Sequence, residues 1–217
     1  MSTFSGEELV RRIDRTLFAA DATRRDLEEL CAEALEHSLH GVAVNTSRVE
    51  LACAILDESD VKVIALVGFP LGASDADVKR YEVETAVDHG AQEIDFVLNL
   101  GRLKEADHRY VLREMRDIAE AADERPVNVI LEMALLTREE IVSACELALD
   151  SGVRSVGTAT DFHCRPVTVE DVRLLRECVG DSFGVKAAGG IEDVATAMAL
   201  LEAGATRVGV SRKGFLI

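Results

Sequence analysis

The chain has 217 residues, of which 48% are hydrophobic and 29% charged, a composition that suits one large domain with a sizeable core. Its formal net charge of −16 argues against a nucleic acid or an anionic membrane as partner, because phosphate groups require compensating Lys and Arg side chains. No apolar run approaches the roughly 18–20 residues of a membrane span, and no signal-peptide pattern opens the chain, so we expect a cytoplasmic protein. Five cysteines, an odd number without a C-x-x-C pair, indicate reduced thiols and no zinc site.

Taken in chain order, eight short apolar segments alternate with amphipathic helical stretches. Most of the segments are nearly continuously apolar, which is typical of parallel strands covered on both faces. The first segment, IDRTL, is the weakest of the eight. The predicted strands lie within residues 13–17, 40–44, 61–68, 93–100, 127–133, 151–157, 183–190 and 203–210.

Helix ends are also legible in the sequence. A glycine follows a helical stretch and precedes a strand in HGVAV (40–44), HGAQEIDFV (89–97), SGVRSVG (151–157) and AGATRVGV (203–210). We expect each of these glycines to end its helix with a positive φ. The residues predicted to open helices are Thr23 with Asp26, Ser74, Thr137 with Glu140, and Thr168.

Eight strands separated by helices over about 200 residues predict a (β/α)₈ TIM barrel in which residues 1–217 form a single domain. A doubly wound open sheet is the alternative, although no G-x-G-x-x-G motif follows a strand. The barrel is expected to be short at the C-terminus, since the chain ends soon after the last strand. The apolar flank left there predicts a homodimer, with Phe215, Leu216 and Ile217 as contacts.

In either architecture, ligands bind at the carboxyl ends of the strands. Residues at these ends are therefore candidates for a site. They are Asp14, Thr16, Asn45, 68–72, Asp95, Asn99, Glu132, the stretch 157–164 with Thr158, Asp161 and His163, and the stretches 186–190 and 209–211.

Two charged residues lie inside strands that should be covered: Asp95 in EIDFVL and Lys186 in GVKAAGG. A buried charge is costly unless it is paired or functional, so we interpret the two as a polar site in the barrel mouth. A structural ion pair is the alternative. Burial lowers the pKa of a lysine and a nearby carboxylate raises it, and such a pair suits proton transfer or attack on a carbonyl. Glu132, in VILEM, is a third such charge, with a structural or a functional role.

Two glycine-containing stretches follow the last two strands. Backbone N–H groups exposed by such stretches can hold a phosphate, and barrel enzymes often place that site after strands 7 and 8. The first stretch contains Gly189 and Gly190, and the second contains Gly209 and Ser211.

The sequence resembles the deoxyribose-phosphate aldolases along nearly its whole length. The matching segments are IDRTLFAADAT (13–23), VAVNTSRV (42–49), VGFPLGAS (67–74), EIDFVLNLG (93–101), VILEMALLTREEI (130–141), GVKAAGGI (184–191) and RVGVS (207–211). The resemblance implies a barrel lyase without metal or cofactor, acting on a small aldehyde or sugar phosphate. In that family a strand-6 lysine forms a Schiff base with acetaldehyde. By motif, Asp95 resembles the proton-relay aspartate, Lys186 the strand-7 lysine, and the four residues named above the phosphate contacts.

The strand-6 motif departs from the family pattern F-V-K-T-S-T-G. Here residues 155–161 read SVGTATD, so Gly157 stands where the lysine is expected and Asp161 stands where a phosphate-binding glycine is expected. A carboxylate at position 161 would repel a phosphate dianion. In this family a histidine usually follows the first aspartate of the chain. Here Arg15 follows Asp14.

Glycine cannot form an imine, so four interpretations stay open. Lys186 could take over the Schiff base, which predicts weak or altered aldolase activity. The barrel could catalyse another lyase, isomerase or proton-transfer reaction, with Asp95 and Lys186 as acid and base. It could bind a small ligand without chemistry, or Gly157 could be an engineered, inactivating substitution in an ordinary aldolase.

His163 and Cys164, adjacent on an extended chain, point to opposite faces and make a poor dyad. Arg165, Arg212 and Lys213 could restore anion binding.

Overall fold

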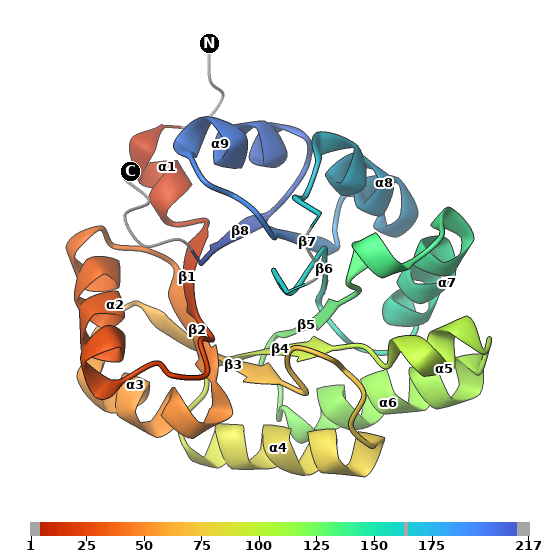
Figure 1. Cartoon of the computed structure of the whole chain (residues 1–217), viewed down its shortest axis with the longest axis horizontal. Helices are drawn as coiled ribbons and strands as arrows, with labels where there is room; N and C mark the ends of the chain where they lie inside the picture. Colours follow the sequence, from red (N-terminus) through yellow and green to blue (C-terminus); the bar gives the residue numbers. More distant parts are fainter. Residues whose placement is uncertain (1–4, 163–164, 212–217) are drawn as a thin grey trace.

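The computed structural model describes residues 5–162 and 165–211, and its centre is a closed barrel of parallel strands (Figure 1). Each strand pairs with the next one in the chain, and β8 pairs with β1 to close the ring. The strands are β1 (Ile13–Leu17), β2 (Gly41–Asn45), β3 (Lys62–Val67), β4 (Glu93–Val97), β5 (Val127–Ile130), β6 (Ser155–Gly157), β7 (Gly184–Ala188) and β8 (Arg207–Val210). The predicted (β/α)₈ barrel is confirmed, and the open-sheet alternative is wrong.

Helices form a ring outside the strands, as the view of Figure 1 shows. They are α1 (Gly6–Val10), α2 (Arg24–Glu36), α3 (Val49–Ile55), α4 (Ala76–Asp88), α5 (Leu100–Lys104), α6 (His108–Ala121), α7 (Arg138–Leu149), α8 (Val169–Val179) and α9 (Val194–Glu202), with the 3₁₀ turns η1 (Thr46–Arg48) and η2 (Met133–Leu135). In the part of the chain that the structure describes, no helix combines the length and apolarity needed to cross a membrane. That residues 1–217 form one domain stays a prediction, and the proposed contacts at 215–217 lie outside the described residues.

The capping predictions hold at three helices. Thr23, Thr137 and Thr168 each accept a hydrogen bond from the backbone N–H three residues on, in complete capping boxes. The prediction for Ser74 is wrong by one residue, because Asp75 is the N-cap of α4 and accepts from the N–H of Asp77. Either side chain can cap a helix, so sequence alone did not separate two neighbouring candidates.

The prediction that a glycine ends a helix with a positive φ is confirmed for three of the four glycines. Gly90, Gly152 and Gly204 have φ values of 98°, 99° and 113° and follow α4, α7 and α9. Gly41 does not end a helix; it lies within β2, and Ser38 takes the positive φ after α2. A Cβ at Gly41 would lie 2.7 Å from the carbonyl oxygen of Lys62, so close approach of β3 explains this glycine.

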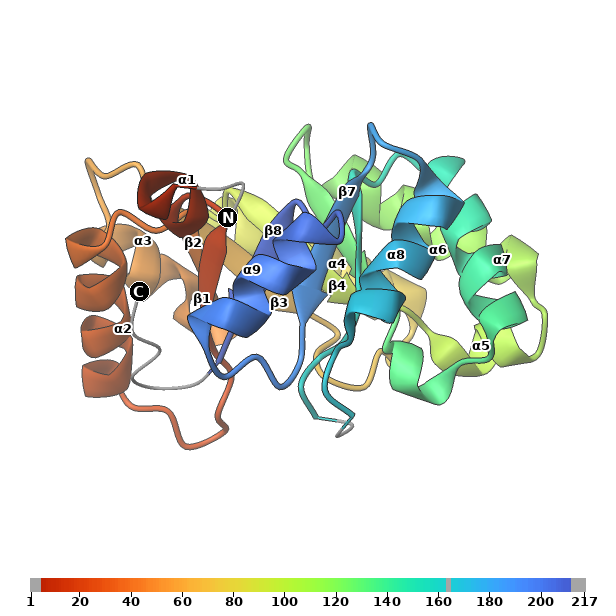
Figure 2. The ribbon, with the colours of Figure 1, turned by 90° about the horizontal axis from the view of Figure 1, so that it is seen from above.

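The strand register turns the polar candidates toward the barrel interior. Asp95 pairs with Leu66 and Asn128, and Gly157 pairs with Lys186. Partners across neighbouring strands face the same side of a sheet, so these side chains share the barrel interior. Seen from the side, the segments that follow β1 and β6 project from the same end of the barrel (Figure 2).

Candidate active site

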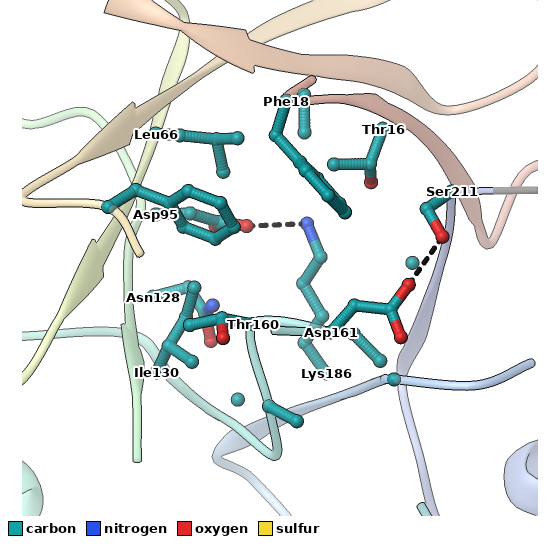
Figure 3. A pocket seen from close by; sticks show the side chains of 17 residues that line it. Thr16, Phe18, Leu66, Asp95, Asn128, Ile130, Thr160, Asp161, Lys186 and Ser211 are labelled. Carbon is teal, nitrogen blue, oxygen red and sulfur yellow. Dashed lines mark hydrogen bonds and ion pairs between the residues drawn. The ribbon is translucent and has the colours of Figure 1, made fainter. Parts of the chain in front are cut away.

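Lys186 lies at the centre of the barrel interior between two carboxylates. Its Nζ is 2.6 Å from Oδ2 of Asp14 and 2.8 Å from Oδ2 of Asp95. The three residues come from β7, β1 and β4, and all are buried, with Lys186 7% exposed. Figure 3 shows the Lys186 side chain extending across the cavity toward Asp95. The sequence predicted one nearby carboxylate; the structure supplies two.

The charges in this cluster shift its pKa values in different directions. Burial acts to lower the pKa of Lys186, but the carboxylates of Asp14 and Asp95 outweigh it and raise the pKa above the ordinary 10.5. Burial acts against ionisation of Asp14, yet the cations Lys186 and Arg207 hold its pKa below the usual 3.8. For Asp95, burial prevails over Lys186 and raises the pKa. Lys186 is therefore an ammonium, and Asp95 is the carboxylate of the cluster most ready to take a proton.

A second layer of ion pairs supports Asp14 from the amino-terminal side of the barrel. Nη1 of Arg207 lies 3.1 Å from Oδ1 of Asp14 and 3.5 Å from Oε2 of Glu93. Glu93 also accepts from Nε2 of His40 at 2.8 Å. This network balances the two carboxylates around Lys186 and fixes the side chain of Asp14.

Gly157 leaves room beside Lys186 that Asn128 partly fills. A Cβ at Gly157 would lie 2.9 Å from Nδ2 of Asn128, a buried side chain on β5. Oδ1 of Asn128 accepts from the hydroxyl of Ser155 at 3.0 Å, whereas Nδ2 has no hydrogen-bond partner. A buried donor without a partner is costly, which marks Asn128 as a group that a ligand can satisfy. The sequence analysis missed it, although an asparagine within the apolar run VNVIL was the available signal.

Asp161 lies at the opposite edge of the cavity, among the predicted phosphate contacts. Its Oδ1 accepts from the backbone N–H of Gly190 at 2.8 Å, and its Oδ2 accepts from the hydroxyl of Ser211 (Figure 3). Gly189, Gly209 and Ser211 line the cavity with it. Two of the groups predicted to hold a phosphate, the Gly190 N–H and the Ser211 hydroxyl, therefore bind a carboxylate of the protein itself.

One wall of the cavity is aromatic. The rings of Phe18, Phe69 and Phe162 contact one another with centroid separations of 5.0–5.7 Å. Phe18 and Phe69 also pack on an apolar cluster formed by Ala43, Ile64 and Leu66. The cavity opens to solvent at its mouth, and its free interior volume is about 30 Å³, so a ligand larger than a few water molecules must occupy the mouth or move the lining side chains apart. It is lined by Thr16, Phe18, Ala43, Leu66, Phe69, Asp95, Asn128, Ile130, Gly157, Ala159, Thr160, Asp161, Lys186, Ala188, Gly189, Gly209 and Ser211.

Among the predicted residues outside this lining, Asn45, Thr158 and Glu132 make contacts within the protein. Asn45 donates from Nδ2 to the carbonyl of Phe18 at 3.3 Å. Thr158 donates to the carbonyl of Ala188 at 2.7 Å and accepts from its N–H at 2.9 Å. Glu132 lies just beyond β5 at a φ of 47° and accepts from the N–H and the hydroxyl of Thr160. These contacts hold the loops around the cavity in place.

Two of the arginines named from the sequence, Arg15 and Arg165, do not face the cavity either. Arg15 points outward to α2, where its Nε lies 2.8 Å from Glu33, and its Nη1 donates to the carbonyl of Val210. Arg165 forms a two-pronged ion pair with Asp171 at the start of α8. His163, Cys164, Arg212 and Lys213 lie outside the described residues. Within residues 5–162 and 165–211, no group of three or more His, Cys, Asp or Glu side chains is arranged to hold a metal ion.

A closed parallel barrel with buried titratable groups at the carboxyl ends of its strands is characteristic of the barrel enzymes. The DeoC/LacD family aldolase model matches residues 10–217, and the chain belongs to this family. A deoxyribose-phosphate aldolase of Clostridium perfringens is 44% identical over 206 residues, which cover 94% of this chain and 92% of that protein. One from Exiguobacterium sibiricum is 47% identical over 204 residues, with the same coverage of 94% and 92%.

Solved structures agree with this assignment. The tetrameric deoxyribose-phosphate aldolase of Aeropyrum pernix superposes with a TM-score of 0.89 at 29% identity, over 95% of this chain and 88% of that one. A second solved aldolase gives a TM-score of 0.90 at 35% identity, over 94% and 91% of the two chains. The relatives support an aldolase-like lyase.

Proposed function

We propose that this chain is a lyase that makes or breaks a carbon–carbon bond beside the carbonyl of a small aldehyde or sugar, without a strand-6 imine. The observation that carries the proposal is the Lys186 ammonium, held between Asp14 and Asp95 next to the open position at Gly157. Its family membership supports the reaction class, and Gly157 requires a route different from the one that the resemblance implies.

In this route Lys186 acts as a hydrogen-bond donor. An ammonium has three N–H groups, and Asp14 and Asp95 occupy two of them. The third can donate to the carbonyl oxygen of a substrate and stabilise the negative charge that develops there when the neighbouring bond breaks. Asn128 Nδ2, buried and unpartnered, supplies a second donor on the same side of the cavity. Asp95, whose pKa burial raises, takes the proton of the substrate's β-hydroxyl as the bond between the α and β carbons breaks, and returns it to the α carbon of the enolate.

The second candidate is an imine on Lys186 itself. Two observations favour it: Lys186 pairs with Gly157 across β6 and β7, and Asp95 lies within 2.8 Å to accept the lysine proton. An imine requires a neutral amine, however, and the raised pKa of Lys186 works against that state. The acid–base route needs no such deprotonation and is preferred for this reason.

Two measurements separate the candidates. Acetaldehyde followed by borohydride, with mass spectrometry of peptides, places an ethyl group on Lys186 if the imine forms. Lys186→Arg keeps the cation but cannot form an imine, so retained activity in the retro-aldol assay supports the acid–base route. The other interpretations have their own outcomes. Isomerisation of a sugar without cleavage would identify an isomerase, and thermal stabilisation by ligands without turnover would identify a non-catalytic binder. Full aldolase activity in Gly157→Lys alone would favour the interpretation of Gly157 as an inactivating substitution.

We further propose that the partner is a small molecule, that the protein works in the cytoplasm, and that it forms a homodimer. The tetramer seen for the Aeropyrum pernix enzyme is a property of that protein. Light scattering coupled to size-exclusion chromatography gives the mass in solution, and any mass other than that of two 23.5 kDa chains contradicts the dimer.

A further inference from the structure

The far end of the cavity is filled by the protein's own carboxylate. Asp161 accepts from the N–H of Gly190 through one oxygen and from the hydroxyl of Ser211 through the other. We call these two donors the anion cradle. They are donors of the kind that would hold a phosphate oxygen, and both are engaged by Asp161.

The backbone at Asp161 favours a glycine. Its φ of 73° lies in the left-handed region, which side-chain-bearing residues rarely adopt. The two hydrogen bonds to the carboxylate compensate for this conformation. The side chain is thus held in the cradle by the protein's own contacts, and a glycine at 161 would leave the backbone relaxed and the cradle open.

Among residues 5–162 and 165–211, no unpaired cation lies at this end of the cavity to offset the charge of Asp161. Lys186 is the one cationic side chain among the described residues that line the cavity, and it is already paired with two carboxylates. Arg15 and Arg165 are engaged by Glu33 and Asp171. A phosphate dianion would have to displace a carboxylate and then remain beside it, which is unfavourable because the two like charges repel each other.

We propose that Asp161 makes this site select an uncharged aldehyde or hydroxyaldehyde over a phosphorylated one. A carboxylate has about four acceptor sites, and the anion cradle uses two of them. A remaining site accepts the hydroxyl of a substrate whose carbonyl lies at Lys186, and Phe18 and Phe69 contact the carbon chain between. The identity of the reaction rests on the proposed function, whereas the exclusion of phosphate depends on Asp161 alone.

Measurements of phosphate binding test, without any turnover, whether Asp161 excludes phosphate from the site. Inorganic phosphate is titrated into the full-length wild type, Asp161→Gly and Asp161→Asn at constant ionic strength, and binding is measured by calorimetry and by ³¹P line broadening. The matched control is Asp181→Asn, which removes one exposed negative charge in the loop before β7. We expect Asp161→Gly to bind phosphate at least about tenfold more tightly than the wild type, a change that calorimetry resolves. Asp161→Asn still fills the cradle and should gain much less, and the control should gain nothing.

Ser211→Ala in the Asp161→Gly background removes one cradle donor and should reverse part of the gain. Asp161→Ser keeps a short side chain and serves as the second open variant if the glycine variant does not fold. Wild-type binding of phosphate as tight as that of the open variants would overturn the proposal, as would an equal gain in the control.

Turnover supplies an independent arm. The condensation of acetaldehyde with glyceraldehyde and with glyceraldehyde 3-phosphate is compared through kcat/KM. The wild type should prefer glyceraldehyde, and Asp161→Gly should shift the ratio toward the phosphate by about tenfold or more. A wild-type preference for the phosphate would overturn the proposal. Absence of turnover in every variant, together with the expected phosphate binding, would refute the proposed function and leave the assignment of Asp161 standing.

Discussion

Nζ of Lys186 lies 2.6 Å from Oδ2 of Asp14, closer than it lies to Asp95. Asp14 is fully buried and also pairs with Arg207, so the amine meets a carboxylate that is itself held ionised. This contact favours the charged form of Lys186 within the cavity. It changes the expected chemistry from attack on a carbonyl to stabilisation of a developing oxyanion.

Replacing Lys186 tests both its role and its contribution to stability. Lys186→Met leaves Asp14 and Asp95 without their shared cation, and we expect the free energy of unfolding to fall by about 3–5 kcal/mol at neutral pH. Protonation of Asp95 relieves the repulsion, so the loss should shrink as the pH is lowered. Urea titrations at several pH values give the loss, and a deficit that grows in acid contradicts the assignment. Lys186→Arg restores the charge and should recover part of the stability.

The fall in the free energy of unfolding at alkaline pH, which we call the alkaline limb, should report the titration of Lys186 directly. Its folded pKa is raised above 10.5, so its contribution is fully present below the unfolded value and is lost as the pH rises through the folded value. We expect the free energy of unfolding to fall more steeply above pH 10.5 in the wild type than in Lys186→Met.

Lys79 provides the matched control for the alkaline limb, because it is equally buried but paired with a single carboxylate, Glu114. Burial lowers its folded pKa below 10.5 despite Glu114. Its titration therefore makes the folded state gain relative stability as the pH rises toward 10.5, the opposite sign. Lys79→Met should leave the steep limb in place; if that limb disappears, the assignment to Lys186 is wrong.

Gly157→Lys combined with Asp161→Gly should install an imine-forming lysine. The new side chain would lie beside Lys186 across β6 and β7, and the neighbouring ammonium should lower its pKa. Its Cβ approaches Nδ2 of Asn128 to 2.9 Å, so the amide must rotate away. We expect borohydride reduction with acetaldehyde to place an ethyl group on residue 157. Gly157→Met, of similar length, is the control, and an adduct confined to Lys186 in both variants contradicts the expectation.

Asn128→Leu should lower activity with little change in stability. The substitution removes a buried donor that has no partner, which offsets the loss of the Ser155 contact, so the free energy of unfolding should change by no more than about 1 kcal/mol. If Asn128 donates to the substrate, kcat/KM should fall by about tenfold or more. An unchanged kcat/KM would exclude Asn128 from the reaction.

Glu132→Ala should affect stability alone. Glu132 is buried and accepts from both the N–H and the hydroxyl of Thr160, so its loss leaves buried donors unpaired and should cost about 2–3 kcal/mol. The ratio of kcat/KM between phosphorylated and unphosphorylated aldehydes should not change, because Glu132 does not line the cavity. A changed ratio would return Glu132 to the list of site residues.

The fold could be predicted because its signals are local. Strand and helix periodicity and the capping boxes at Thr23, Thr137 and Thr168 depend on residues a few positions apart. Where two local solutions compete, as at Ser74 and Asp75, the sequence could not choose. At Gly41 the reason for the glycine is a contact with β3, which lies beyond any local pattern.

The sequence by itself determined that charged groups stand at strand ends, that position 157 has no amine and that position 161 carries a carboxylate. It could not decide which of these groups meet, because β1, β4 and β7 come together only when the barrel closes. Closure added Asp14 to the Lys186 pair, left Asn128 facing the cavity, and placed Arg15 against Glu33 and Glu132 against Thr160. Closure also sets the pKa values that govern the chemistry, since burial and charge separation are properties of the packed interior.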